Sequence, residues 1–190
     1  ARSGLWGRRC RHFDFGENLR RAASPARPKT FRLTGTNLAV ICRSLATGAL
    51  LEDSEFPTAA RIFKGFLRAA RPGPGDLILL NGLPRHPGQA EKMDRLVDVI
   101  AVVELAASPA VIRERIRRDT GGDRRGRIDD SLADIDKKLS VFRKRTRPLI
   151  AHYRDRGAKI VRLRVGAGMS ARTMLSKLEA KSALPATART

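Results

Sequence analysis

The stretch that decides the fold is Asp76–Met93, DLILLNGLPRHPGQAEKM. An apolar run, Leu77–Leu80, breaks into the turn NGLPR at residues 81–85, and Gln89 follows the arginine of this turn by four residues. The pattern predicts a short buried strand that delivers an arginine and an amide side chain to its carboxyl end. In open α/β sheets, ligands bind at such strand ends. The stretch therefore predicts a ligand-binding edge, and the alternative is a strand followed by an ordinary polar turn.

Outward from this stretch, predicted strands alternate with predicted helices. The strands are expected at residues 9–13, 77–80, 99–105 and 159–165, and the helices at 14–23, 35–45, 56–70, 87–96, 108–118, 129–157 and 170–180. This alternation predicts parallel pairing and a doubly wound α/β fold. We expect one domain over residues 1–182 and a disordered tail over 183–190.

The turn and the glutamine after it resemble the signature [DN]-G-[FL]-P-R-x-x-x-Q of adenylate kinases and related nucleoside monophosphate kinases. The resemblance implies that Arg85 grips the phosphate of the monophosphate, with Gly82 in the same turn, and that Gln89 reads the adenine. It also implies a P-loop kinase-like sheet flanked by helices. Residues 24–70 would then form the helical insert that binds the monophosphate, and residues 118–128 a short lid.

Two further segments resemble the acceptor side of that family. HFDFGENLR at residues 12–20 resembles its H-[IV]-[SD]-x-G-[DE]-x-[LI]-R element, in which a glycine allows close approach to a helix start. By resemblance, Arg20 is the second arginine on the monophosphate, where a guanidinium matches phosphate oxygens better than lysine does. TGALLED at residues 47–53 resembles the stretch that packs on the acceptor base, through Leu50 and Leu51. The alternatives are a solvated helix arginine and two ordinary core leucines.

The basic segment over residues 113–127 resembles the lid region of the same family. Arginines there neutralise charge that moves between the two nucleotides during transfer. Arg127 matches the first residue of the lid ending R-x-D-D, and Arg115 or Arg118 is the arginine at the near end, with the register left open. The alternative is a solvated charged helix.

Two other positions belong to the donor and lid side by resemblance. Lys138 stands where the family usually has another lid arginine, so the charge is kept and the bidentate fork is lost. Gly166, in the run VGAG, lies where the donor adenine packs on backbone in the family.

The sequence departs from the family pattern in two ways. Asn81 replaces the aspartate that helps to hold magnesium through water, so metal affinity at this position should fall. The phosphate-binding loop G-x-x-x-x-G-K-[ST] does not occur, and only eleven residues precede His12. Either a first strand and this loop lie outside the sequence given, in which case residues 2–8 end the first helix and its turn, or the donor site has been lost. Without that central strand, exposed sheet edges should make the chain poorly stable or prone to aggregate.

Composition sets broad limits on function. The chain has 190 residues, a net charge of +20, and an aromatic content of only 5%. The charge favours non-specific association with nucleic acid, whereas few aromatics argue against a base-stacking platform. Apolar runs are far shorter than the roughly 20 residues of a membrane span. Cys10 and Cys42 are isolated, so neither a zinc site nor a disulfide framework is implied. We expect a cytoplasmic monomer that binds no membrane.

The combined expectation is a nucleoside monophosphate kinase. It would transfer a phosphoryl group from ATP to AMP or another monophosphate, with Mg²⁺ accompanying ATP if the phosphate-binding loop is present. The expected catalytic residues are Arg85, Arg127 and Lys138, and no protein metal ligand is expected. Whether the chain is an enzyme stays open, because it should be inactive without the loop. The alternatives are a non-catalytic nucleotide- or nucleic-acid-binding relative and a basic RNA-associated domain.

Overall fold

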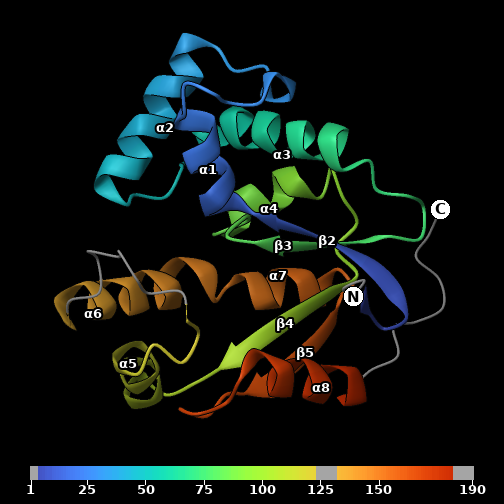
Figure 1. The fold of residues 1–190 in the computed structure, drawn as a ribbon, viewed down its shortest axis with the longest axis vertical. Helices are drawn as coiled ribbons and strands as arrows, with labels where there is room; N and C mark the ends of the chain where they lie inside the picture. The colour runs from blue at the N-terminus through green and yellow to red at the C-terminus, as the bar shows by residue number, and fades with distance from the viewer. Residues whose placement is uncertain (1–3, 123–131, 182–190) are drawn as a thin grey trace. The chain divides into compact units, whose positions relative to one another are not determined.

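The structure, a computed structural model, describes residues 4–122 and 132–181 of the chain. The chain divides into two compact units, Ala1–Val97 and Asp98–Thr190, which we call the N-unit and the C-unit. Figure 1 traces the elements of both units in chain order. The single domain expected over residues 1–182 stays a prediction.

The N-unit combines a small sheet with a helical layer. Its elements are β1 (Gly4–Leu5), β2 (Arg8–Asp14), α1 (Phe15–Ala23), α2 (Gly35–Thr47), α3 (Phe56–Ala70), β3 (Leu77–Asn81) and α4 (Pro87–Met93), with 3-10 turns at Lys29–Phe31 and Asp53–Glu55. The strands and helices predicted for this part of the chain are confirmed, except that α4 ends three residues earlier than expected. The expected monophosphate-binding insert, residues 24–70, contains α2, α3 and both 3-10 turns.

Strand β2 lies between β1 and β3. It pairs with β3 in parallel, from Cys10 opposite Leu77 to Asp14 opposite Asn81. Parallel neighbours run in the same direction, so their carboxyl ends share one edge of the sheet. The register therefore sets Asp14 beside Asn81 at the edge where the sequence predicts a ligand.

The opposite end of the β2–β3 pair is held by charge. The Asp76 carboxylate, just before β3, accepts hydrogen bonds from Arg9 at 2.7 Å and Arg11 at 3.1 Å, both in β2. It also accepts from the Gly73 amide at 3.1 Å. The hydrogen bond from Arg9, followed by those from Gly73 and Arg11, holds the pKa of Asp76 well below its usual range.

The first residues of the N-unit differ from the prediction. The sequence pattern predicts the end of a helix over residues 2–8, whereas Gly4–Leu5 pair antiparallel with the start of β2. Trp6 and Gly7 have φ values of 53° and 74°, the positive dihedrals of a type I′ hairpin turn. Leu5 is 3% exposed. The prediction of a helix end is therefore wrong for the described residues, because a tight turn and a buried leucine favour the hairpin.

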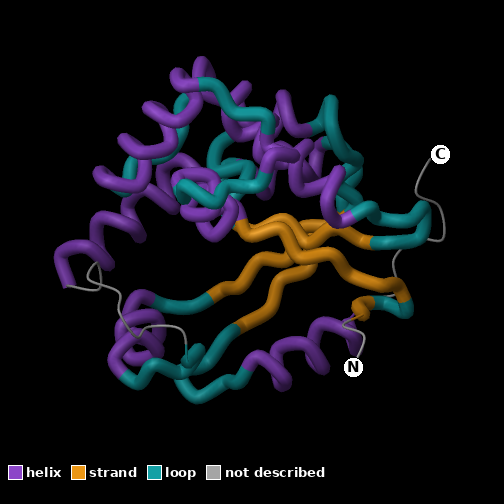
Figure 2. Tube along the Cα trace, turned by 45° about the horizontal axis from the view of Figure 1, so that its top comes forward, coloured by secondary structure: helices purple, strands orange, loops and turns teal. Residues whose placement is uncertain are grey.

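The core of the N-unit lies between the β2–β3 sheet and its helices. Phe13 of β2 is completely buried, and its ring meets Phe63 and Phe66 of α3 edge-on, with centroids 5.0 and 5.1 Å apart. Helices α1, α2 and α3 lie on the same side of the two strands (Figures 1 and 2). One face of the sheet thus carries the apolar cluster that supports the predicted site.

A close contact joins α3 to the 3-10 turn before α2. A Cβ atom on Gly65 would lie 2.4 Å from Phe31 Cδ1 and 2.9 Å from both Phe31 Cα and the Thr30 carbonyl oxygen. The Arg68 guanidinium donates to that same carbonyl. The two segments therefore lie so close together that only glycine fits at position 65, and a side chain there would push them apart.

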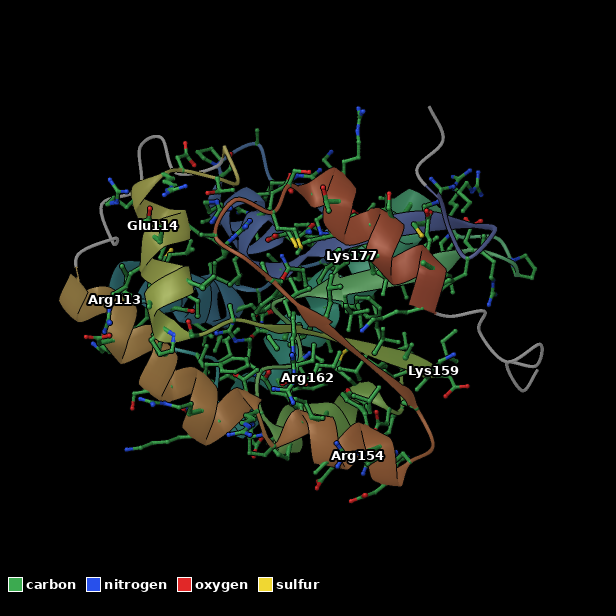
Figure 3. The ribbon with its side chains drawn as sticks, turned by 90° about the horizontal axis from the view of Figure 1, so that it is seen from below. Arg113, Glu114, Arg154, Lys159, Arg162 and Lys177 are labelled. Carbon is green, nitrogen blue, oxygen red and sulfur yellow. The ribbon has the colours of Figure 1, made fainter. Side chains whose placement is uncertain are left out.

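The C-unit contains a second pair of parallel strands. Its described elements are β4 (Ala101–Ala106), α5 (Pro109–Arg117), α6 (Leu132–Val141), a π turn (Phe142–Thr146), α7 (Leu149–Asp155), β5 (Lys159–Arg164) and α8 (Ala171–Lys181). Strands β4 and β5 pair from Ala101 opposite Lys159 to Ala106 opposite Arg164. Figure 3 shows α7 and α8 on either side of β5.

The long helix predicted over residues 129–157 is not continuous. Its predicted start at Asp129 lies outside the described residues. After α6, the chain widens into the π turn, where the Arg147 amide donates to the Phe142 carbonyl at 2.8 Å. Pro148 then precedes α7. Proline lacks an amide hydrogen and its ring crowds the preceding turn, which explains the break.

The α/β class and parallel pairing are confirmed. The described strands form two sheets, β1–β2–β3 and β4–β5. One doubly wound sheet with a short lid stays a prediction, as does the tail over 183–190, which lies outside the described residues. Within the part of the chain that the structure describes, no helix is both long enough and apolar enough to cross a membrane.

Candidate functional site

The candidate site begins at the carboxyl ends of β2 and β3. Asp14 caps α1, because its Oδ1 accepts a hydrogen bond from the Glu17 amide at 2.7 Å. Its Oδ2 accepts from Asn81 Nδ2 at 2.8 Å. The predicted asparagine is thus tied to the start of α1, and both Asp14 carboxylate oxygens are already bonded.

Gly82 follows Asn81 and brings the next turn against α1. Its φ is +79°, a left-handed conformation that favours glycine. A Cβ atom there would lie 3.4 Å from Phe15 Cβ and 3.9 Å from the Phe15 nitrogen. The predicted turn therefore lies directly beside the first residue of α1, which explains a glycine at this position.

Arg20 lies over the start of its own helix. A Cβ atom on Gly16 would be 3.6 Å from Arg20 Nη1 and 3.4 Å from Asp14 Oδ1. Arg20 is exposed. Its guanidinium thus points back to the same sheet edge, where an anion could meet it together with the helix start.

Arg85 is half-buried, and Gln89 fixes its backbone. The Arg85 amide donates to Gln89 Oε1 at 2.8 Å. Burial lowers the pKa of the Arg85 guanidinium from its ordinary value, although arginine stays charged at neutral pH. A cation that has lost part of its water gains more from a bound anion than an exposed one does.

Gln89 also reaches the segment predicted to pack on the base. Its side chain is 1% exposed, and its Nε2 donates to the Leu51 carbonyl at 2.7 Å. Leu51 is 2% exposed, whereas Leu50 is half-buried. The structure thus brings Leu51, Arg85 and Gln89 together. In this structure the Gln89 amide is bonded to protein through both of its polar atoms.

The donor-side predictions fall in the C-unit. The Arg115 guanidinium donates to three carbonyl groups, those of Gly166 at 2.9 Å, Ala167 at 3.3 Å and Met169 at 2.7 Å. Arg115 and Gly166 are therefore in contact, as a shared donor site would require. Through these bonds Arg115 holds the loop after β5. The carbonyl oxygens are neutral acceptors, so the guanidinium charge is not neutralised by them.

The remaining lid positions are less organised. Arg118 and Arg117 both pair with Glu114, and these two bonds lower the pKa of Glu114 to about 2. Lys138 is exposed on α6. Arg127 lies outside the described residues, so the predicted lid ending is not part of the described structure.

Magnesium finds no ready site in the described residues. No group of three or more His, Cys, Asp or Glu side chains among them could hold a metal ion. At the sheet edge, both carboxylate oxygens of Asp14 accept hydrogen bonds within the protein. A magnesium ion held here would therefore take most of its oxygen ligands from water and from nucleotide phosphates.

Sequence reasoning did not single out His86 or Asp53 as functional. His86 is 6% exposed, and its Nε2 lies 3.2 Å from the Leu51 carbonyl oxygen. The Asp53 carboxylate fills the space over Gly88, where a Cβ atom would meet its oxygens at 2.3 and 2.4 Å. The available signal was the spacing of His86 and Gln89, three residues apart at a helix start, which places both on one face.

The fold and the arginines of the candidate site fit one broad class of protein. An α/β chain with parallel strands, and with arginines at the strand ends, is compatible with the P-loop kinase-like proteins. No family model matches the chain.

Comparison with single curated proteins, however, finds similar sequences. The chain is 43% identical over 84 residues to an adenylate kinase of Synechococcus sp. (strain CC9311), covering 42% of this chain and 43% of the relative. It is 36% identical over 110 residues to that of Synechococcus sp. (strain WH7803), covering 55% of each. It is 33% identical over 121 residues to that of Xanthomonas campestris pv. campestris (strain B100), covering 60% of this chain and 59% of the relative. The chain is related to the adenylate kinases, and it spans about half the length of the curated relatives it matches.

Proposed function

We propose that the N-unit is the acceptor site of an adenylate kinase-like phosphotransferase. It binds a nucleoside monophosphate, and AMP is the preferred candidate. The observation that carries the proposal is the half-buried Arg85, whose backbone amide donates to Gln89 and which follows the turn that Gly82 sets beside the start of α1. Arg20 approaches the same edge from α1. Two arginines from different elements suit a phosphate, because each guanidinium can bond two phosphate oxygens.

The proposed reaction is ATP + NMP ⇌ ADP + NDP. An oxygen of the acceptor phosphate forms a bond to the γ-phosphorus of ATP, and the bond from that phosphorus to the bridging oxygen breaks. The electron pair of the broken bond leaves with ADP. Arg85 and Arg20 would hold the attacking phosphate and offset its charge, which is the main contribution a protein makes to phosphoryl transfer. Lys138 and Arg127 would act from the lid side.

Magnesium enters this proposal only as the companion of ATP. On the acceptor side, Leu51 and Leu50 would pack against the base. Gln89 would read adenine only after exchanging a bond that it now makes to the protein.

The test is calorimetric titration of AMP into the full chain and into two single variants. Arg85→Ala should weaken AMP on the order of 100-fold, because charged hydrogen bonds to a partly desolvated cation are lost. Arg95→Ala is the matched control, since Arg95 is exposed in the turn after α4 and removes the same charge. Equal AMP affinities in the two variants, or no AMP binding by the unaltered chain, would overturn the proposal.

A second candidate function is nucleic-acid binding by the C-unit, and one stretch of it favours this. Between residues 143 and 164 the chain has one acid, Asp155, and nine basic residues: Arg143, Lys144, Arg145, Arg147, Arg154, Arg156, Lys159, Arg162 and Arg164. Figure 3 shows Arg154 on α7, Lys159 and Arg162 on β5, and Lys177 on α8. Such a distribution suits a phosphate backbone, without aromatic stacking.

Fluorescence anisotropy with a labelled duplex, over a range of salt concentrations, tests this candidate. Arg154→Gln with Lys177→Gln should lower the affinity and flatten its salt dependence, because each lost phosphate contact removes about 0.9 from the slope. Arg113→Gln is the matched control, since Arg113 pairs with Asp136 at 2.5 Å. An unchanged slope in the double variant would remove this candidate.

A further inference from the structure

The Leu51 carbonyl accepts two side-chain hydrogen bonds from the start of α4. Gln89 Nε2 donates at 2.7 Å, and His86 Nε2 lies 3.2 Å from the same oxygen. A carbonyl oxygen cannot donate, so His86 carries its proton on Nε2 in this contact. One oxygen with two lone pairs can accept both bonds. Two buried donors therefore hold one backbone group in the stretch predicted to face the base.

The other side of the imidazole faces the Asp53 carboxylate. His86 Nδ1 lies 3.7 Å from Asp53 Oδ1, and the Asp53 carboxylate rests over Gly88. Lys92 donates to the Asp53 carbonyl at 2.5 Å. With its proton on Nε2, the ring makes no hydrogen bond to Asp53 across this 3.7 Å, so it is held by its burial and by its Nε2–H bond to the Leu51 carbonyl. With the ring so fixed, its Nε2–H stays aimed at Leu51 whatever Gln89 does.

Gln89 has two competing uses at this position. In the structure its Nε2 serves Leu51, whereas reading a base would require that amide to turn away. If Gln89 were the only donor, the buried Leu51 carbonyl would then be left without a hydrogen bond, which is unfavourable for a buried acceptor. With His86 in place, the carbonyl keeps a partner. The second donor therefore removes the part of the penalty for releasing Gln89 that falls on the Leu51 carbonyl.

We propose that His86 is a positioning residue that holds the Leu51 carbonyl and so frees the Gln89 amide to select the base of the bound monophosphate. This inference rests on the proposed acceptor function. His86 does not touch the ligand in it; His86 acts through Leu51 and Gln89. His86 should therefore raise the affinity only of a monophosphate whose base forms a hydrogen bond with the released Gln89 amide.

The experiment compares AMP with CMP, whose smaller base presents a different edge. Calorimetry gives both affinities for the unaltered chain, for His86→Phe and for His86→Gln, after a thermal melt has shown that each is folded. His86→Phe keeps a ring without the N–H group, and His86→Gln restores an amide donor. We expect His86→Phe to lose about tenfold in AMP affinity, the value of one hydrogen bond, while CMP binding is unchanged. His86→Gln should recover most of the loss.

A spectroscopic signal separates this role from a merely structural one. The side-chain amide resonance of Gln89, assigned by its absence in Gln89→Leu, should move when AMP binds the unaltered chain and stay in place in His86→Phe. An AMP preference that survives in His86→Phe would overturn the inference and leave the acceptor function standing. A parallel loss of AMP and CMP binding would also overturn it. If the unaltered chain binds no monophosphate, the acceptor function fails and the inference fails with it. Should His86→Phe not fold, His86→Asn, whose amide is too short to reach Leu51, takes its place with the same expected outcomes.

Discussion

The N-unit and the C-unit hold their charged side chains in different ways. In the N-unit, the Asp76 side chain is 8% exposed and accepts hydrogen bonds from two arginines and a backbone amide. In the C-unit, Glu114 also pairs with two arginines, but its side chain is 28% exposed, and Arg117 and Arg118 are 71% and 57% exposed, against 49% and 31% for Arg9 and Arg11. The first arrangement ties the start of β3 to β2, whereas the second joins neighbouring side chains at the end of α5. The same residue types thus serve geometry in one unit and surface charge in the other.

The apolar cores explain this difference. In the N-unit, Phe13, Phe31 and Phe63 are at most 2% exposed and belong to one buried apolar cluster. The C-unit leaves Leu105 57% exposed and Leu175 44% exposed. Polar side chains can be locked only where packed neighbours restrict their rotamers. A site that needs fixed donors is therefore better supported in the N-unit.

The largest effect is expected from Gly65→Ala in the N-unit. The new Cβ atom would press on the backbone at Thr30 and Phe31, at 2.9 Å from each, so the segments must separate. Overpacking of this kind costs about 1–3 kcal/mol, which outweighs the gain of roughly 1 kcal/mol that alanine brings to a helix. Urea unfolding should show a net loss of stability. Gly73→Ala is the control, because nothing lies within 4 Å of a Cβ there. Equal stabilities would mean that the N-unit is not tightly packed at this contact.

A smaller effect, with a distinct pH dependence, is expected from Asp76→Asn. Hydrogen bonds from Arg9, Gly73 and Arg11 hold the pKa of Asp76 below its unfolded value, which is about 3.9. The stabilisation is therefore present above that unfolded value, and it is lost as the pH falls into the acid range. Thermal melts should show a lower Tm for the variant at pH 7 and a shrinking difference below about pH 4. A difference that stays constant over this range would show that the carboxylate charge is not what holds β3 to β2.

The contrast between the units also shows what a sequence can predict. Helix starts such as Ser108 and Ser170 were visible because a cap is local, and both serine side chains accept the expected backbone hydrogen bonds. The strand β3 was visible as an apolar run between turns. The parallel register that sets Asp14 beside Asn81 then follows from the expected topology.

Long-range contacts carried no local signal. The bond from His86 to Leu51 spans 35 residues, and that from Gln89 to Leu51 spans 38. The approach that requires Gly65 depends on how a 3-10 turn packs against α3. The N-terminal hairpin depends on φ values that Trp6 rarely adopts. Such features follow from tertiary packing, so the sequence indicated candidate residues at the sheet edge but not the bonds that position them.

The smallest effect is expected from Glu114→Gln in the C-unit. Arg117 and Arg118 lower the pKa of Glu114 to about 2, so its charge also contributes only above its unfolded pKa, about 4.3, and the contribution is lost as the pH falls toward 2. The pair is nevertheless exposed, and water and salt screen it. Thermal melts at pH 7 and physiological salt should therefore barely separate Glu114→Gln from the unaltered chain. A loss as large as that of Asp76→Asn would break the comparison, because an exposed triad would then fix the C-unit as firmly as the buried carboxylate fixes the N-unit.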